Sequence, residues 1–260
     1  MTFSLRLTAD LTLGLAVRAI GAKRGQPLML QLSADDVLAS SSASQTASGQ
    51  GTAPDFSPSL AAMLSQNCSP IIWITGSETL EHPHVARFTN AIAASRRHVF
   101  LETSGAPLKS RLHEFQPSSH FYFAIRFAGC NALRDQRDAR EGALHIGLEA
   151  FRMARLAGFF TCAHLVLQPD TVAGELEELH AQISKLDVDG FVITPGALTP
   201  ELVKQTGRLR RHLLSRRCAL LSSLLDAGAL SAVSRISLEL GRPPLPESQR
   251  DSLGEGAEAG

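Results

Sequence analysis

The sequence is poor in residues that form metal sites, disulfides or redox pairs. Its 260 residues include four cysteines, at Cys68, Cys130, Cys162 and Cys218, and no two of them have the CxxC spacing of a metal or redox site. An isolated cysteine is most often a small buried hydrophobic side chain. We therefore expect no metal-binding residues, and thiols of this kind are consistent with the reducing cytoplasm.

The chain also lacks a net charge and any long apolar run. Lys and Arg total 25, as do Asp and Glu, so the basic excess of a nucleic-acid-binding protein is missing. No stretch reaches the roughly 18 apolar residues of a membrane-spanning helix. The apolar segment from Leu11 to Ile20 is interrupted by Arg18, which favours a helix of the mature protein over a leader. We expect a cytoplasmic protein without a nucleic-acid partner or a transmembrane span.

What the sequence does contain is a regular alternation of buried strands and amphipathic helices. Strands are predicted at residues 28–32, 71–75, 98–102, 121–127, 159–167 and 190–194, and helices at 3–23, 57–65, 82–95, 108–115, 142–157, 172–186 and 200–217. Strands that alternate with helices indicate right-handed crossovers and a parallel sheet. We predict an α/β fold, a partial TIM barrel of about six strand–helix units with an N-terminal helix. A doubly wound sheet is the alternative, although no GxGxxG turn follows the first strand.

Composition divides the chain into three parts. Residues 1–26 form an N-terminal helical segment, and residues 27–240 form the barrel. Within the barrel, residues 39–54 are almost all Ser, Ala, Thr, Gln and Gly, so we predict a disordered low-complexity loop there. Residues 241–260 are rich in Pro, Gly and acidic side chains and are predicted to be a disordered tail.

Polar side chains follow the predicted strands where a barrel of this type binds its ligands. In parallel barrels this is the carboxyl end of the strands. Gly76 lets a ligand approach the backbone closely, Glu78 could accept a hydrogen bond from an ammonium group, and a hydroxyl beside them could bind a carboxylate. The candidate ligand-binding residues are Gly76, Ser77, Glu78, Thr103 and Ser104.

The same residues are also consistent with a second function class, a lyase or transferase that uses acid–base chemistry. Its acid–base candidates are Glu78, Glu102 and Asp170, with Arg126 beside them. A strongly raised pKa of one of these carboxyl groups would favour it. The sequence contains no GxSxG, HExxH or P-loop motif, so we assign no catalytic residue.

The segment at residues 74–83, Ile-Thr-Gly-Ser-Glu-Thr-Leu-Glu-His-Pro, resembles the Gly-Gly-Glu-Pro-Leu…His-Pro segment of radical S-adenosylmethionine (radical SAM) enzymes. Residues 98–107, 131–142 and 188–196 are similar, in order and spacing, to the strands and loops that follow it in that superfamily. Within it, the chain most resembles the adenosylhopene transferases of hopanoid synthesis, over roughly residues 5–240. The resemblance implies a radical-SAM-like barrel whose first segment contacts the amino group of S-adenosylmethionine.

The sequence departs from that family where the family binds iron. The CxxxCxxC triplet that holds a [4Fe–4S] cluster through thiolates should follow the first strand, yet residues 33–57 contain no cysteine. Ser77 and Thr79 also replace a glycine and a proline of the family segment. We expect no cluster, and a pseudoenzyme or accessory protein that still binds S-adenosylmethionine or a related small ligand. An active radical SAM enzyme of hopanoid or isoprenoid lipid metabolism is the less favoured alternative.

A run of arginines marks the last predicted helix and bears on the partner. It comprises Arg208, Arg210, Arg211, Arg216 and Arg217. Such a run is usually a solvated face, and contact with an anionic partner or a lipid headgroup is the alternative. The expected partner is a small-molecule ligand or another protein, with peripheral membrane contact as a further option.

Overall fold

The structure is a computed structural model, and it describes residues 3–19, 27–34, 69–128 and 142–239. Three predicted segments lie outside these ranges: the low-complexity loop, the helix after it and the C-terminal tail, at 39–54, 57–65 and 241–260. The division of the chain into an N-terminal segment, a barrel and a tail therefore stays a prediction.

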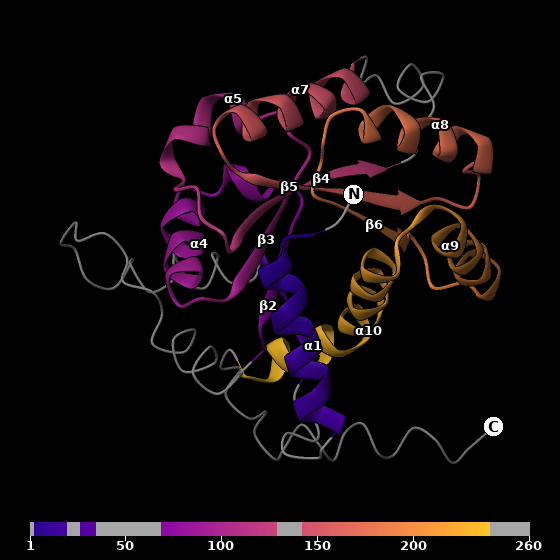
Figure 1. The fold of residues 1–260 in the computed structure, drawn as a ribbon, viewed down its shortest axis with the longest axis horizontal. Helices are drawn as coiled ribbons and strands as arrows, with labels where there is room; N and C mark the ends of the chain where they lie inside the picture. The colour runs from indigo at the N-terminus through magenta and orange to yellow at the C-terminus, as the bar shows by residue number, and fades with distance from the viewer. Residues whose placement is uncertain (1–2, 20–26, 35–68, 129–141, 240–260) are drawn as a thin grey trace, which may run out of the picture.

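Six parallel strands, hydrogen-bonded in chain order, curve into half of a barrel (Figure 1). They are β1 (Met29–Ser33), β2 (Ile71–Thr75), β3 (His98–Thr103), β4 (Phe121–Ala128), β5 (Phe160–Leu167) and β6 (Gly190–Pro195). Most of their side chains are buried, as expected for a parallel sheet that is covered on both faces. The predicted α/β partial barrel of six strand–helix units is confirmed.

Helices between the strands cover the convex face of the sheet (Figure 1). They are η2 (Thr79–Glu81), α4 (Val85–Ala94), α5 (Leu108–Arg111), η3 (Leu112–Glu114), α7 (Ala143–Leu156), α8 (Ala173–Ser184) and α9 (Pro200–Leu213). Their ends follow ordinary capping rules. The Thr199 hydroxyl accepts a hydrogen bond from the Leu202 N–H at the start of α9, and Gly158, with a φ of +84°, follows α7.

Several helix boundaries differ from the sequence prediction. The helix expected at 108–115 is α5 followed by the 3-10 helix η3, and two further differences have a clear cause. The helix expected at 82–95 begins only at Val85, because His82 is extended before Pro83, as residues that precede proline tend to be. The helix expected at 200–217 is two helices, since the backbone of Leu214 is extended. The second, α10, begins at residue 216, and the Ser215 hydroxyl accepts a hydrogen bond from the backbone in its first turn.

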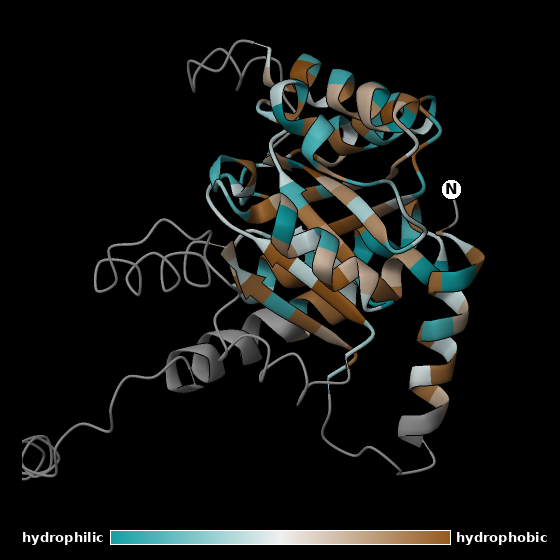
Figure 2. Ribbon diagram, turned by 90° about the vertical axis from the view of Figure 1, so that its left-hand side faces the viewer, coloured by the Kyte–Doolittle hydropathy of each residue, from teal (hydrophilic) through white to brown (hydrophobic). Residues whose placement is uncertain are grey.

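The concave face of the sheet is covered by the two helices at either end of the described chain, α1 (Leu5–Ala19) and α10 (Arg216–Glu239). Both lie on the open side of the curved sheet in Figure 1, opposite the outer helices. Helix α10 contacts β1 and β6, which are the two edge strands. Figure 2 shows the predominantly hydrophobic strands that these helices cover. The interior of the half-barrel is therefore filled by packed side chains near the amino ends of the strands.

A ladder of stacked aromatic rings forms the floor of this interior. Trp73, Phe100, Tyr122 and Phe160 occupy matching positions on β2 to β5, and their ring centroids are 4.9, 4.5 and 5.1 Å apart. Phe3, just before α1, places its ring edge-on against Phe100 and Tyr122. Such ring pairs add stabilisation beyond the area that they bury. The floor closes the amino-terminal end of the barrel, so any ligand site lies above it.

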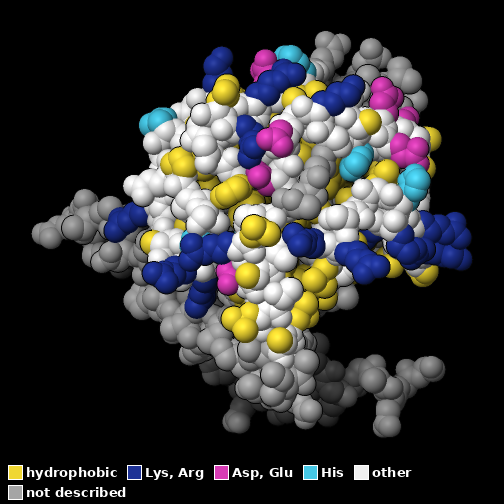
Figure 3. Space-filling view, viewed as in Figure 1, with side chains coloured by type: hydrophobic (Ala, Val, Ile, Leu, Met, Phe, Trp, Pro, Cys, Tyr) yellow, Lys and Arg dark blue, Asp and Glu magenta, His cyan; other side chains and the backbone are white. Residues whose placement is uncertain are grey.

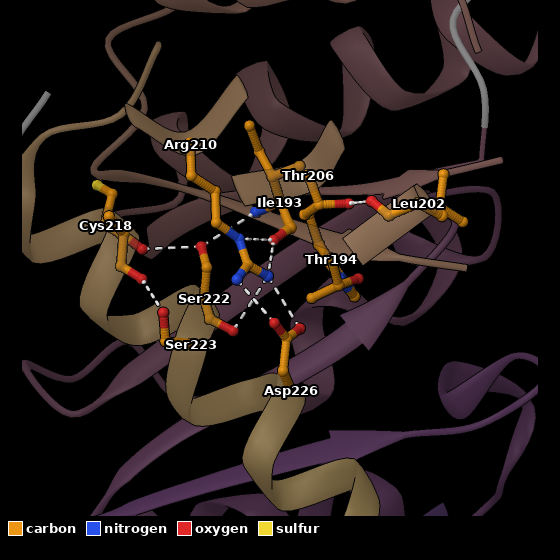
Figure 4. A network of polar contacts seen from close by, with 11 residues as sticks. Ile193, Thr194, Leu202, Thr206, Arg210, Cys218, Ser222, Ser223 and Asp226 are labelled. Carbon is orange, nitrogen blue, oxygen red and sulfur yellow. Dashed lines mark hydrogen bonds and ion pairs between the residues drawn. The ribbon is translucent and has the colours of Figure 1, made fainter. Parts of the chain in front are cut away.

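A polar network satisfies the outer edge of β6 and fastens α10 to it (Figure 4). The Ser222 hydroxyl accepts a hydrogen bond from the Ile193 N–H at 3.2 Å, and Arg210 donates to the Ile193 carbonyl at 2.8 Å. Arg210 also forms a two-pronged ion pair with Asp226, at 2.7 and 2.9 Å. Arg210 is thus buried, which corrects the interpretation of the whole arginine run as a solvated face.

Candidate functional site

A chain of hydrogen bonds crosses the concave face near the carboxyl ends of the strands. The Trp73 indole donates to the Glu102 carboxylate at 3.0 Å, and the other partner of the same oxygen is His164 Nδ1, at 3.1 Å. His164 Nε2 lies 2.8 Å from the Thr194 hydroxyl. Each side chain comes from a different strand, and the curvature of the sheet brings all four together. Glu102, His164 and Thr194 are all buried.

Arg126 connects this buried network to solvent. Its guanidinium lies 3.4 Å from the second Glu102 oxygen, and its side chain is 37% exposed, whereas that of Glu102 is 5% exposed. Burial raises the pKa of Glu102, but His164, the Trp73 hydrogen bond and Arg126 together outweigh it, so the pKa is lowered. Glu102 is therefore a carboxylate at neutral pH, and it forms an ion pair with Arg126 on the buried side of the guanidinium.

This geometry suits anion binding better than acid–base catalysis. A guanidinium carries five donors in a planar fork, and among the described residues the contact with Glu102 involves one nitrogen of that fork, whose geometry suits a carboxylate or a phosphate. A lowered pKa makes Glu102 a weak base, and Asp170 lies exposed on the turn after β5. The raised carboxyl pKa that would favour a cluster-free lyase or transferase is not found at Glu102.

Thr194, His164 and Glu102 follow the hydroxyl–imidazole–carboxylate order of hydrolase triads. Thr194 is only 8% exposed, however, and both ring nitrogens of His164 already have partners. The arrangement fixes the orientation of His164, and it keeps the second Glu102 oxygen 3.4 Å from Arg126. It does not present a nucleophile to solvent.

A second polar cluster joins the loops that follow β2 and β3, and it contains three of the predicted ligand-binding residues. One carboxylate oxygen of Glu78 accepts hydrogen bonds from the Thr103 hydroxyl at 2.6 Å and the Leu80 N–H at 3.2 Å. The other accepts from the N–H and the hydroxyl of Ser104, at 2.9 and 2.6 Å. Four donors match the roughly four lone-pair sites of a carboxylate. In this structure the hydrogen-bond acceptors of the Glu78 carboxylate are therefore satisfied by donors of the protein itself.

The two remaining predicted residues lie in the turn that Glu78 fastens. Gly76 is half-buried and Ser77 is exposed, between the end of β2 and η2. Next in the chain, the buried Thr79 donates a hydrogen bond to the Glu102 carbonyl, which joins this turn to the strand that carries the first network. All five predicted residues therefore meet at the carboxyl ends of β2 and β3.

Trp73 and His164 are not among the residues predicted for the site, because both lie in strands whose sequences are nearly continuous apolar runs. A signal was available in the alternation of side chains along a strand. In the sheet, His164 pairs with Arg126 across β4 and β5, and it lies two residues beyond Cys162 on the concave face. A histidine on the inner face of a buried strand, beside an arginine near the mouth, indicates a polar network there.

The two described cysteines do not fit a metal cluster. Cys162 and Cys218 are unpaired and buried among the apolar side chains of the concave core. Burial raises the pKa of the Cys162 thiol well above its ordinary value, whereas cluster ligands must be thiolates. Cys68 and Cys130 lie outside the described residues. Within the described ranges, no three His, Cys, Asp or Glu side chains are placed to hold a metal ion.

Comparison with known proteins finds similarity to solved structures. No protein-family model and no curated protein matches the chain. Streptococcus suis SuiB bound to S-adenosylmethionine aligns with 72% of this chain and 45% of its own, at 10% identity and a TM-score of 0.49, and SuiB bound to its precursor peptide SuiA gives the same values. Archaeal TYW1 aligns over 66% of this chain and 68% of its own, at 11% identity and a TM-score of 0.42. The chain thus spans less than half of the SuiB chain.

Among the described residues, no helix has the length and apolar character needed to cross a membrane. The fold and the site together define an α/β half-barrel with a closed floor and a polar mouth. The mouth carries a buried carboxylate and a partly exposed arginine.

Proposed function

We propose that the mouth of this half-barrel binds S-adenosylmethionine, or a small molecule with the same amino-acid group. The supporting observation is Arg126, a partly exposed guanidinium held by an ionised, buried Glu102 at the carboxyl ends of the strands. A planar guanidinium in this position suits a carboxylate, because two parallel hydrogen bonds can form between the two groups. The resemblance of residues 74–83 to the radical SAM segment identifies the candidate ligand.

In this proposal the residues of the two clusters have different roles. Arg126 binds the ligand carboxylate, and the backbone of Gly76 and Ser77 contacts the ligand amino group. Glu78 positions that turn through Thr103 and Ser104 and does not touch the ligand. S-adenosylmethionine supplies an activated carbon on its sulfonium when bound, and the residues named here bind and orient it.

We further propose a pseudoenzyme or accessory role without an iron–sulfur cluster. Residues 33–57, which follow the first strand, contain no cysteine, and Cys162 and Cys218 are buried in apolar surroundings. The resemblance to adenosylhopene transferases suggests descent from that family, so hopanoid synthesis is where we would seek a partner protein. Iron and sulfide analysis of anaerobically purified protein tests this part, and a stoichiometric four-iron cluster would contradict it.

Calorimetric titration of the metal-free protein with S-adenosylmethionine tests the binding proposal. We expect micromolar affinity, and we expect Arg126→Gln to weaken it about tenfold or more, as loss of a charge-assisted hydrogen-bond pair should. Arg152→Gln is the matched control, because Arg152 is exposed on α7 at the convex face. Absence of binding, or equal effects of the two substitutions, would overturn the proposal.

A further inference from the structure

Helix α1 exposes an apolar face that points away from the barrel. Leu7 and Leu11 point inward and are buried in the concave core. On the opposite face, Leu5 is 81% exposed and Leu13 is 64% exposed. Ala9 lies between them in the helix and is exposed too. A packed surface helix normally turns such residues inward, so this outer face has the character of a contact surface.

Basic side chains surround this apolar face. Figure 3 shows hydrophobic side chains along α1, with Lys and Arg gathered on both sides of it. Arg6 lies on α1 itself and is exposed, and Arg96 lies close enough to His120, at the amino end of β4, to lower its pKa. Arg216 and Arg217 are exposed on the first turn of α10, which packs into the same core cluster as α1. The chain as a whole has no net charge, so this concentration is local.

The one acidic side chain of α1 turns inward, away from this apolar face. Asp10 pairs with the buried His98 at 2.8 Å, across the contact between α1 and the first residue of β3. The apolar face is therefore bordered by cations, a combination that matches the polar headgroups and anionic phosphates of a lipid surface.

We propose that α1 and its flanking arginines form a docking surface for an anionic membrane. Leu5 and Leu13 would enter the boundary between headgroups and acyl chains, while Arg6, Arg216 and Arg217 contact lipid phosphates. Helix α1 packs on the amino-terminal part of the barrel, where Ser4 lies 2.7 Å from the Tyr122 hydroxyl. The mouth is at the other end of the strands and stays accessible, so this surface is independent of the proposed ligand site.

Flotation with lipid vesicles tests the proposal on the full chain. We expect binding to vesicles of equal parts phosphatidylcholine and phosphatidylglycerol, weakening with added salt, and none to phosphatidylcholine alone. The double variant Leu5→Ser, Leu13→Ser should lose about tenfold or more in affinity. Its matched control is Leu156→Ser, Leu198→Ser, since these leucines are similarly exposed but lie at the end of α7 and between β6 and α9.

A second pair of variants tests the cationic border. The double variant Arg216→Gln, Arg217→Gln should weaken binding about 30-fold. Lys109→Gln, Arg152→Gln removes two exposed charges of the outer helices and should leave binding unchanged. The proposal is overturned if the protein ignores anionic vesicles or if test and control variants lose binding equally. It is also overturned if the wild type is a dimer that the α1 variant dissociates, because a second copy then covers the face.

Discussion

The Glu78 carboxylate is surrounded by four hydrogen-bond donors from its own chain. Glu78→Gln keeps the shape but places an amide N–H₂ where a carboxylate oxygen accepts two hydrogen bonds. We expect the free energy of unfolding to fall by about 1–3 kcal/mol, together with weaker ligand binding. Urea unfolding measures this, with the exposed Glu81→Gln as control. Lost binding at unchanged stability would instead mean that Glu78 contacts the ligand directly.

Two buried histidines under α1 should make folding sensitive to acid. Burial is the main cause that lowers the pKa of His98 and of His120 below the ordinary 6.5. The positive charge of Arg6 lowers both pKa values further, and that of Arg96 lowers the pKa of His120. The negative charge of Asp10 raises both, but does not outweigh the burial. Below pH 6.5 these histidines are therefore protonated more readily in the unfolded chain than in the folded chain. The free energy of unfolding should be highest above pH 6.5 and should fall as the pH drops below it. The fall is at most about 1.4 kcal/mol per pH unit for each histidine.

Urea unfolding across this pH range checks the expectation. The double variant His98→Asn, His120→Asn should flatten the dependence below pH 6.5. His145→Asn is the control, because the His145 side chain is 69% exposed on α7 and should leave the slope unchanged. A slope that survives the double substitution would show that other groups cause it.

At the scale of the elements, α1 docks where β6 begins with a glycine. A Cβ on Gly190 would lie 1.9 Å from the ring of Phe3, so Gly190→Ala cannot keep α1 in place. We expect a loss of about 1–3 kcal/mol in the free energy of unfolding, from overpacking. Gly174→Ala is a matched control on the exposed side of α8, where an added Cβ meets nothing within 4 Å. That change should instead stabilise the protein by about 0.5–1 kcal/mol, and equal effects would contradict the docking described here.

The attachment of α10 depends on Arg210, which serves β6 and Asp226 at once. Arg210→Met would leave the Ile193 carbonyl and the Asp226 carboxylate without their donor. We expect a loss of about 3 kcal/mol, the low end for a buried ion pair because the Asp226 side chain is 25% exposed. Arg208→Met, exposed on the same helix, should cost little by comparison. Similar unfolding midpoints for the two variants would show that this network is not needed to hold α10.

The sequence predicted elements well where a local rule decides them, and poorly where a tertiary contact does. Buried strands such as β2 were predicted at their true bounds from apolar runs, and Gly158 correctly marked the end of α7. The break between α9 and α10 was missed, because Leu214 fits an apolar helical pattern and becomes extended only in the folded chain. The burial of Arg210 was missed as well, since it requires the edge of β6 and Asp226 on another helix.

The site was predictable in the same uneven way. The rule that ligands bind at the carboxyl ends of parallel strands placed Gly76, Glu78 and Thr103 at one end of the barrel, and the structure brings them together there. Their role in ligand binding stays a prediction. Hydrogen-bond saturation of Glu78 is invisible in a sequence. So is the partnership of Trp73 and His164 with Glu102, because it arises from the curvature and register of the strands.

In the molecule as a whole, the half-barrel is closed at the amino ends of its strands and polar at their carboxyl ends. Helices α1 and α10 and the aromatic ladder fill the concave face near the amino ends of the strands. Above them, the Glu102 network ends in Arg126, and the Glu78 cluster shapes the neighbouring turn. This division allows one end to bind a ligand while the surface around α1 contacts a membrane.

Recognition of the ligand carboxylate by Arg126 can be measured in a two-by-two calorimetric titration. The wild type and Arg126→Gln are each titrated with S-adenosylmethionine and with its decarboxylated form. We predict that the wild type prefers S-adenosylmethionine about tenfold or more and that the variant binds both within about twofold. A variant that keeps the full preference for the carboxylate would contradict this account.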